Sequence, residues 1–312
     1  MPRPGGPSNR LRPGIRVIVE VPATSANLGP GFDCFGLALD WTDTVTVEVT
    51  DAGFVADISG EGAGKVPKDQ RHLVISSARA GLADLGVDVS GLLVLSHNTI
   101  PHGRGLGSSS AAIVAGLAAA FGLAARCGVV GRALDLEWLL RHANAIEGHP
   151  DNVAAAIYGG FVLAYADTGV VRVVSAVIHP EIAAVAWVPS AALATKRARG
   201  LLPASVPHAD AAADAGRAAV LVHAIRGAPG LLLAGTEDWL HQSYRSPAMP
   251  ASYDLVQRLR AEGHAAVISG AGPSVLVLTR TDEVDALLAR EEPGFVARAL
   301  RPADGVRLID PG

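Results

Sequence analysis

The chain has 312 residues, of which 49% are hydrophobic and 18% are charged, and its formal net charge is −4 at pH 7. This length allows one large domain or two ordinary ones, and the apolar share is that of a globular protein with an ample core. The acidic balance argues against a nucleic-acid surface or a basic membrane patch, so any anionic ligand must be held locally by backbone amides, a metal or a few arginines.

The compartment is indicated by the cysteines and by the start of the chain. Cys34 and Cys127 are too few for a disulfide framework and suit a reducing environment. Residues 1–14 contain Pro, Gly and Arg but no apolar segment, so we expect a flexible leader rather than a signal peptide. No apolar run reaches the roughly 18 residues that a membrane span needs. These features predict a cytoplasmic protein that binds neither nucleic acid nor membrane, and they leave the oligomeric state open, a homodimer included.

The first half of the chain alternates between strand and helix patterns. Period-two alternation of apolar residues predicts strands at 16–21 and 42–51, and the polar, glycine-bearing segment 22–33 between them is expected to be a loop. Longer apolar or amphipathic runs predict the other elements. In chain order these are a helix at 72–86, a buried strand at 91–100, a buried helix at 109–126, an amphipathic helix at 134–147, a short helix at 153–160 and a strand at 161–166.

The second half continues the alternation. The pattern predicts strands at 171–178 and 182–189, helices at 210–227 and 252–263, and two strands joined by a glycine turn over 265–279. Interleaved strands and helices mean an α+β or α/β protein, and the strongly antiparallel character of the first hundred residues favours α+β. We place a boundary at residue 167, between an N-terminal domain at 15–166 and a C-terminal domain at 167–312.

Residues 101–112, PHGRGLGSSSAA, carry three glycines and three serines between the buried strand and the buried helix. A helix N-terminus offers unpaired N–H groups and partial positive charge, which attract anions. Glycines let the backbone wrap a polyphosphate, and serines add hydroxyl donors or a metal ligand. The segment is no Walker A loop, since GK[ST] is absent, and Ser108 stands where a dinucleotide fingerprint needs glycine. The alternative is a serine-capped helix after a flexible turn.

Three segments resemble motifs of the GHMP kinases, the superfamily of galactokinase, homoserine kinase, mevalonate kinase and phosphomevalonate kinase, and they follow one another in the same order as in that superfamily. They are PATSANLGPGFDCFGLAL at 22–39, the segment 101–112, and AAVISGAGPSVLVL at 265–278. The resemblance implies a two-domain α+β fold with the active site in the interdomain cleft. It also implies that ATP phosphates are wrapped by a loop of Pro101, His102, Gly103, Arg104, Gly105, Leu106, Gly107, Ser108, Ser109, Ser110 and Ala111.

Residues 24–39 are close to the pattern of the homoserine kinases in particular. By this resemblance Asn27 contacts the hydroxyl end of the substrate and Asp33 holds its α-ammonium, for which a carboxylate is a suitable partner. Read without the family, both side chains are short enough simply to bond their own backbone. Cys34 beside them is expected to be packed core.

The substrate carboxylate is assigned to two basic segments that resemble homoserine kinases. TKRARGLLP at 195–203 gives Thr195 and Arg199, and HQSYR at 241–245 gives Arg245. The planar fork of arginine can grip a carboxylate at two points. Two neighbours, Arg197 and His241, are alternatives for these roles, and each arginine on its own would read as a solvated surface charge.

Glu147 ends a predicted helix, where the macrodipole disfavours a carboxylate and so suggests a compensating cation. In the family a glutamate near this position and a serine of the phosphate loop hold Mg2+ bound to ATP, an ion that prefers oxygen ligands. The resemblance therefore assigns Glu147 with Ser109 or Ser110, and Glu137 is the competing carboxylate. Catalytic roles fall to Asn152, Glu147, Ser109 and Arg199.

His149 and Asn152 are expected to face the substrate, and Asp151 either caps the next helix or supports its neighbours. Asn152 stands where the mevalonate-kinase branch has a basic aspartate, and an amide is no useful proton acceptor. The hypothesis is therefore direct in-line attack on the γ-phosphorus, the proton passing to a phosphate oxygen. The adenine pocket is expected near 66–74.

The resemblance implies phosphorylation of the side-chain hydroxyl of L-homoserine by ATP with Mg2+, giving O-phospho-L-homoserine for threonine biosynthesis. The alternatives are a mevalonate or sugar kinase of the same superfamily and a non-catalytic sensor that keeps the fold. Asp33 together with two arginines argues against substrates that lack an amine, and the intact phosphate loop argues against a silent sensor.

Overall fold

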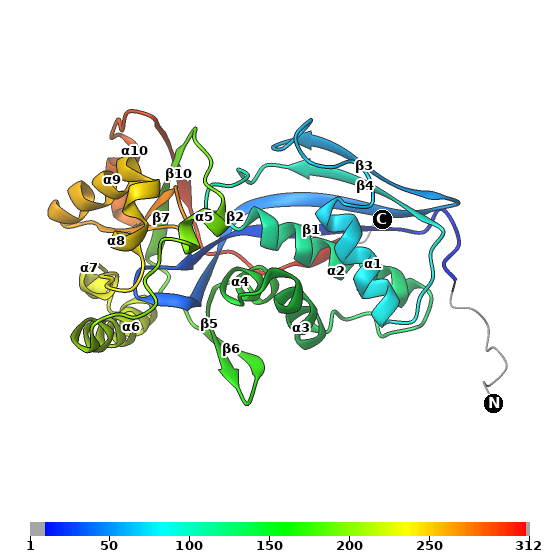
Figure 1. Ribbon diagram of the computed structural model, residues 1–312, viewed down its shortest axis with the longest axis horizontal. Coiled ribbons are helices and arrows are strands. Elements are labelled where there is room, and N and C mark those ends of the chain that lie inside the picture. Colours follow the sequence, from blue (N-terminus) through cyan, green and yellow to red (C-terminus); the bar gives the residue numbers. More distant parts are fainter. Residues whose placement is uncertain (1–9, 310–312) are drawn as a thin grey trace.

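Two β-sheets follow one another along the long axis of the computed structural model, which describes residues 10–309 (Figure 1). The larger sheet has the strand order β11-β1-β2-β4-β3, and β5 and β6 extend it beside β2. Among the strands that residues 10–309 form in this sheet, only β3 and β4 pair in parallel. Its strands are β1 (Arg16–Asn27), β2 (Gly31–Thr50), β3 (Gly53–Gly60), β4 (Gly91–Asn98), β5 (Phe161–Asp167), β6 (Val170–Ala176) and β11 (Arg307–Ile309).

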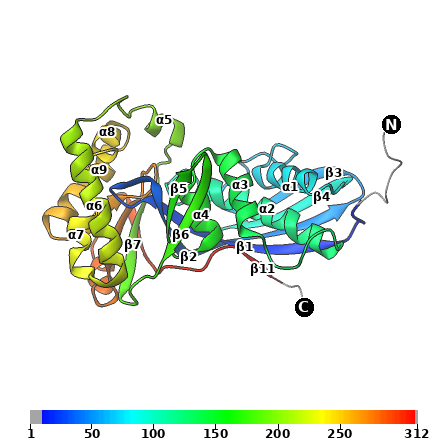
Figure 2. The ribbon, with the colours of Figure 1, turned by 90° about the horizontal axis from the view of Figure 1, so that it is seen from below.

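Four helices cover one face of this sheet, as Figures 1 and 2 show from two sides. They are α1 (Leu73–Asp84), α2 (Ser108–Arg126), α3 (Leu136–Glu147) and α4 (Asp151–Tyr158). Small residues let α1 and α2 pack closely, since a Cβ on Gly116 would lie 2.5 Å from the carbonyl oxygen of Val74. Against the expectation from the sequence, α2 is long and apolar enough to cross a membrane, but 78% of its apolar window is buried, as in the core helix of a globular domain.

The smaller sheet is antiparallel, with the order β10-β7-β9-β8. Its strands are β7 (Ile182–Pro189), β8 (Ala265–Ile268), β9 (Val275–Arg280) and β10 (Phe295–Leu300). The helices of this half are α5 (Thr195–Arg199), α6 (His208–Gly227), α7 (Leu232–Gly235), α8 (Gln242–Arg245), α9 (Pro250–Ala261) and α10 (Val284–Leu288), with 3-10 turns at Pro229–Leu231, Ser246–Ala248 and Thr281–Glu283. Trp187, Leu255 and Val275 belong to the apolar cluster between this sheet and its helices.

The α+β class is confirmed, and one element of the prediction is wrong. Segment 22–33 is not a loop: residues 22–27 continue β1, and β2 begins at Gly31. Ala23–Ala26 pair with Gly36–Leu39, so the polar side chains of this segment are buried within a ladder instead of solvated in a loop. Period-two alternation also failed to reveal β3, β10 and β11, and the short helices α5 and α8 were not anticipated.

The two ends of the N-terminal half differ from the expected boundaries. Residue 167 lies in the β5–β6 hairpin, and the chain changes sheet between Ala176 and Ile182, while β11 returns to pair with β1. Of the expected leader, residues 1–9 lie outside the described residues. Leu11 is buried and its N–H donates to the Asp88 carbonyl at 3.0 Å, so residues 10–14 pack on the larger sheet instead of forming a free leader.

The tip of the β1–β2 hairpin reaches from the larger sheet to the smaller half (Figure 1). The Gly270 N–H, in the turn between β8 and β9, donates to the carbonyl of Ala26 at 3.1 Å. Gly29 sits so close to Thr236 that a Cβ there would lie 2.4 Å from the Thr236 carbonyl oxygen. The hairpin tip therefore contacts the smaller half, and Thr24 in β1 contacts the phosphate loop at Leu106.

Candidate active site

The phosphate loop connects β4 to α2 and is fixed from three sides. Gly103, Gly105 and Gly107 have φ values of 66°, 73° and 72°, which glycine adopts without strain. The Thr24 N–H donates to the Leu106 carbonyl at 3.1 Å, and a Cβ on Gly107 would lie only 1.9 Å from the Thr24 hydroxyl oxygen. These contacts hold the loop against the β1–β2 hairpin.

Arg104 and Ser269 fasten the same loop to the other half of the molecule. The Arg104 guanidinium donates to the carbonyls of Pro189 and Ser190 at 2.8 Å each and to that of His102 at 2.9 Å. The Ser269 hydroxyl donates to the Gly105 carbonyl at 2.6 Å. Arg104 thus braces the loop against the end of β7, and each of its three side-chain nitrogens already donates a hydrogen bond within the protein.

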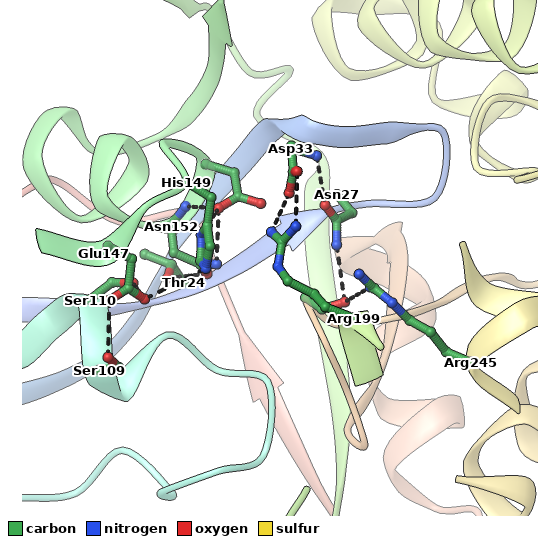
Figure 3. Close-up of polar contacts among 12 residues, drawn as sticks. Thr24, Asn27, Asp33, Ser109, Ser110, Glu147, His149, Asn152, Arg199 and Arg245 are labelled. Atoms are coloured by element: carbon green, nitrogen blue, oxygen red, sulfur yellow. Dashed lines mark hydrogen bonds and ion pairs between the residues drawn. The ribbon is translucent and has the colours of Figure 1, made fainter. Parts of the chain in front are cut away.

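The serine-capped helix is not what the structure shows. The N-cap of α2 is Gly107 in the left-handed conformation, and no side chain caps the described helix. Two of the loop serines turn to Glu147 instead: Ser109 Oγ donates to Glu147 Oε2 at 3.1 Å, and Ser110 Oγ to Oε1 at 2.9 Å (Figure 3). The backbone N–H groups at the start of α2 are therefore left without a side-chain cap, a feature shared with helix N-termini that bind anions.

Glu147 is brought to the loop as the last residue of α3. Its side chain is 12% exposed, and it lies at the negative end of the helix, where a cation would stabilise it. The competing Glu137 is exposed in the first turn of the same helix, about 15 Å away at 1.5 Å per residue. Glu147, with Ser109 and Ser110, therefore forms the oxygen cluster that faces the phosphate loop.

Asp151 is the centre of a second polar group, in which Thr24, His149 and Asn152 are labelled in Figure 3. Its Oδ1 atom accepts hydrogen bonds from His149 Nδ1 at 3.0 Å and from the backbone N–H and side-chain amide of Asn152 at 2.7 and 3.2 Å. The side-chain oxygen Oδ1 of Asn152 in turn accepts a hydrogen bond from the Thr24 hydroxyl at 2.8 Å. The hydrogen bond to Asp151 raises the pKa of His149, and burial works against it. The group favours an imidazolium beside the phosphate loop.

Asp33 and Arg199 form an ion pair at the edge of the pocket. Arg199 Nη1 and Nη2 donate to the two carboxylate oxygens of Asp33 at 3.0 and 2.5 Å. Asn27 fixes this edge, since its Oδ1 accepts from the Asp33 N–H and its Nδ2 donates to the Gly270 carbonyl, both at 3.0 Å. The amide of Asn27 is thus engaged in holding the hairpin tip and the glycine turn together.

Arg245, on α8, completes the basic side of the pocket. Its side chain is 1% exposed, and its Nη1 lies 3.3 Å from both the Gly270 carbonyl oxygen and His241 Nδ1. Burial and, less strongly, the neighbouring Arg199 lower its pKa to about 10. None of the ion pairs formed by the described residues involves Arg245. A buried guanidinium without a carboxylate partner is a binding position for an anion.

A small cavity of about 90 Å3 collects almost all of the expected site residues. Its lining comprises Asn27, Gly103, Arg104, Gly105, Leu106, Gly107, Ser108, Ser109, Ser110, Glu147, His149, Asp151, Asn152, Thr195, Arg199, Arg245, Gly270 and Ala271. Asp33 stands beside this lining through its pair with Arg199. Pro101 and Ala111 are buried at the two ends of the loop.

The alternatives Arg197 and His241 do not line this cavity. Arg197 is exposed on α5, and His241 is fully buried behind Arg245. The residues that the sequence analysis missed as functional are Thr24, Phe32 and Gly270. All three lie inside the quoted motifs, but their contacts are visible only in the structure. Thr24 donates to Asn152, the Phe32 ring lies against Arg199 and Arg245, and the Gly270 carbonyl accepts from Asn27.

A second cavity, of about 280 Å3, adjoins the phosphate loop at Ser108 and Ser109. Val66, Pro67, Arg71, His72, Leu73 and Val74 line it, all from the segment expected to shape the adenine pocket. His102 lines it as well, and burial lowers the pKa of His72 facing it. Asp43, Ser96 and Asn98, from β2 and β4, were not anticipated in this place.

Comparison with known proteins identifies the family. Residues 72–160 match the model of the GHMP kinases N terminal domain, and residues 221–291 that of the GHMP kinases C terminal. A homoserine kinase of Streptomyces avermitilis is 53% identical over 91% of this chain and 92% of its own length, and one of Cutibacterium acnes is 48% identical over 94% and 99%. The chain belongs to the homoserine kinases of the GHMP kinase family.

Solved structures agree with this placement. The homoserine kinase from Cytophaga hutchinsonii superposes with a TM-score of 0.79 at 28% identity, covering 94% of this chain and 97% of that one. A putative homoserine kinase from Listeria monocytogenes gives 0.75 at 32% identity, covering 95% and 100%. A mevalonate kinase of L. major, at 16% identity and a TM-score of 0.67, shares the fold. The expected family and its two-domain fold are confirmed.

Proposed function

We propose that the protein transfers the γ-phosphoryl group of ATP to the side-chain hydroxyl of L-homoserine, giving O-phospho-L-homoserine and ADP. The observation that carries this proposal is the buried, unpaired guanidinium of Arg245 next to the Asp33–Arg199 pair and the phosphate loop. An amino acid with a hydroxyl side chain offers a carboxylate, an ammonium and a nucleophile to these three places. The curated relatives of high identity carry the same activity in their names.

The amino-acid end of the substrate matches the charges of the pocket. Arg245 and Arg199 are positioned to grip the carboxylate, and Asp33 to accept hydrogen bonds from the ammonium. In the structure Asp33 and Arg199 form an ion pair with each other. A zwitterionic amino acid can replace that pair, because its ammonium binds Asp33 and its carboxylate binds Arg199. Thr195 lines the same cavity and adds a hydroxyl at the edge.

ATP is assigned to the two adjoining cavities. Backbone N–H groups of the loop and of the α2 N-terminus suit the phosphates, as at other helix N-termini that bind anions. The larger cavity beside it suits the adenine and ribose, with apolar walls from Val66 and Leu73. Its junction with the loop at Ser108 and Ser109 allows one nucleotide to occupy both.

The donors around Glu147 fit Mg2+. One carboxylate and two hydroxyl groups are hard oxygen ligands, and a magnesium ion on a nucleotide commonly takes only one or two protein ligands besides phosphate and water. Within residues 10–309 no group of three or more His, Cys, Asp or Glu side chains is arranged so that it could hold a metal ion. When bound, Mg2+ supplies charge neutralisation at the phosphates.

The residues of the chain then act by position and charge. The side-chain oxygen of Asn152 is engaged by the Thr24 hydroxyl, and the Oδ1 atom of Asp151 already accepts three hydrogen bonds, so neither of these two oxygen atoms is free to take the proton. We infer that the homoserine hydroxyl attacks in line and that its proton passes to a phosphate oxygen. His149 lines the same cavity, and the hydrogen bond to Asp151 raises its pKa, which favours the positively charged form that would stabilise the transferred group.

A substrate panel tests the proposal. Purified protein with Mg·ATP is given L-homoserine, mevalonate, galactose and L-serine, and ADP release is measured. We expect turnover of L-homoserine well above that of every other alcohol. Preferential turnover of mevalonate or galactose would instead make the protein another small-molecule kinase of the family.

A further inference from the structure

Arg245 makes few contacts that would hold its charged group in one place. Its Nη1 atom makes two long hydrogen bonds, of 3.3 Å each, and its buried Nε atom donates to no atom of the described chain. A guanidinium that must present its fork to a carboxylate needs support, because a loosely held donor loses part of its binding energy to ordering. What supports Arg245 therefore bears on substrate binding.

The imidazole of His241 provides this support from outside the pocket. His241 is fully buried, and its Nε2 lies 2.9 Å from the Gly29 carbonyl oxygen, which can only accept. Nε2 must therefore carry the hydrogen, and the remaining nitrogen, Nδ1, is left with a lone pair facing Arg245 Nη1 at 3.3 Å. Burial lowers the pKa of His241, which agrees with this neutral form.

His241 is itself held by the start of α8. The buried carboxylate of Asp238 accepts the N–H groups of Leu240, His241 and Gln242, at 2.9, 3.2 and 2.7 Å. The side chain of Gln242 then accepts the Ile268 N–H at the end of β8, next to the glycine turn. The imidazole thus joins the hairpin tip to α8, and Gln242 and Arg245 of α8 connect it to the glycine turn.

Phe32 completes the support as an aromatic surface. The Arg245 and Arg199 Cζ atoms lie 5.3 and 5.5 Å from the centroid of its ring, and the His241 ring centroid lies 5.4 Å away. Arginine stacks favourably over aromatic rings within about 6 Å. One ring therefore contacts both arginines assigned to the substrate carboxylate and the imidazole behind one of them.

We propose that His241 is a positioning residue, which through its Nδ1 lone pair and with the Phe32 ring orients Arg245 for the carboxylate of the amino-acid substrate. The inference rests on the proposed function. His241 touches neither substrate nor ATP, so its effect reaches the reaction only through Arg245. The sequence offered His241 as an alternative direct ligand of the substrate carboxylate; in this proposal Arg245 is the ligand and His241 orients it.

A mutant cycle tests this. His241→Gln keeps a donor for the Gly29 carbonyl but replaces the ring, with its fixed Nδ1 acceptor and its contact with Phe32, by a flexible amide. It is expected to raise the KM for L-homoserine about tenfold, the scale of one hydrogen bond to a charged group, with the KM for ATP within about twofold. In an Arg245→Lys background the same change is expected to have little further effect, because the two residues act as a unit. His142→Gln on α3, where the histidine lies 3.2 Å from Asp84, is the matched control and should leave both KM values unchanged.

Two results would overturn the inference: equal increases in both KM values, or additive effects of His241→Gln and Arg245→Lys on kcat/KM for homoserine. If His241→Gln does not fold, Phe32→Leu carries the same test, since it removes the ring and is expected to raise the KM for homoserine alone. Failure of the wild type to phosphorylate homoserine would contradict the proposed function instead, so the two failures are distinguishable.

Discussion

The carboxylate of Asp33 and the guanidinium of Arg199 meet in a two-point ion pair, although 166 residues separate them in the chain. About a third of each side chain is exposed, so the pair itself contributes little to stability and opening it costs little. It joins the β1–β2 hairpin to α5 at the edge of the pocket. A zwitterionic substrate can replace it, because it supplies both an ammonium for Asp33 and a carboxylate for Arg199.

Replacement of Asp33 by Asn should affect the amino acid and spare the nucleotide. Loss of a charge-assisted hydrogen bond costs about 1.5–3 kcal/mol, so we expect the KM for L-homoserine to rise roughly 10- to 150-fold. The KM for ATP should stay within about twofold, because Asp33 is not among the residues that line the nucleotide cavity. Steady-state kinetics with each substrate varied in turn measure both constants.

Asp57→Asn is the control for this change, since Asp57 is exposed on β3 and far from the hairpin tip in the sheet order. It should behave as the wild type. An equal rise in both KM values for Asp33→Asn would mean that the residue holds the fold of the pocket and not the ammonium.

Glu147→Gln tests the proposed magnesium position. The amide lacks the negative charge that attracts the ion, and we expect kcat to fall roughly 10²-fold, corresponding to about 3 kcal/mol of lost transition-state stabilisation. The Mg2+ concentration needed for half-maximal rate should rise as well. Rates at fixed ATP across a magnesium series, with chelator as the zero point, give both quantities.

Glu137→Gln is the matched control on the same helix, exposed and away from the loop serines. A magnesium dependence that shifts in Glu137→Gln and not in Glu147→Gln would move the ion to the other end of α3.

Asp151→Asn distinguishes positioning from base catalysis. The side chain is buried and its Oδ1 is occupied by His149 and Asn152, so direct attack without a protein base predicts substantial residual turnover, within about tenfold of the wild type. Single-turnover rates separate the chemical step from binding. A loss of about 10³-fold or more in a variant whose circular dichroism and melting are normal would restore Asp151 as the general base.

Much of the candidate site could be predicted from the sequence, because most of the residues that line the site lie in a few contiguous motifs. Gly103, Gly105 and Gly107 are visible as a loop before a helix, and their left-handed backbone is what glycine permits. The resemblance assigns Glu147 and the helix-end argument supports it, and its contacts with Ser109 and Ser110 agree with that assignment. Local rules were sufficient for these residues.

Long-range contacts set the limit of that reading. Segment 22–33 is polar and glycine-bearing, which is typical of loops, yet pairing with Gly36–Leu39 makes most of it strand. Arg104 reads as a phosphate ligand, but the carbonyls of Pro189 and Ser190, more than 80 residues away, engage it. In the sequence His241 is an alternative substrate ligand because it lies in the same segment as Arg245. The structure instead places its Nε2 against the Gly29 carbonyl, from a distant segment, and its Nδ1 against Arg245.

Asp214 on α6 should make stability depend on pH. It is buried, and burial raises its pKa to about 6, while its hydrogen bond from the Trp239 N–H works against that shift. Because the folded-state pKa lies above the unfolded value of 3.8, the native state holds this proton more tightly. The associated stability is fully present below pH 3.8 and is lost as the pH rises through about 6.

Asp214→Asn removes the free-energy cost of a buried, ionised carboxylate at neutral pH and keeps an oxygen that can accept the hydrogen bond from the Trp239 N–H. We expect the variant to be more stable than the wild type by about 1–3 kcal/mol at pH 7.5 and by progressively less as the pH falls toward 4. Urea denaturation at several pH values measures the difference in free energy of unfolding, and Asp57→Asn, from an exposed site, should show no such trend. A difference that stays constant with pH, or a variant less stable at pH 7.5, would mean that the Asp214 carboxyl titrates normally in the folded protein.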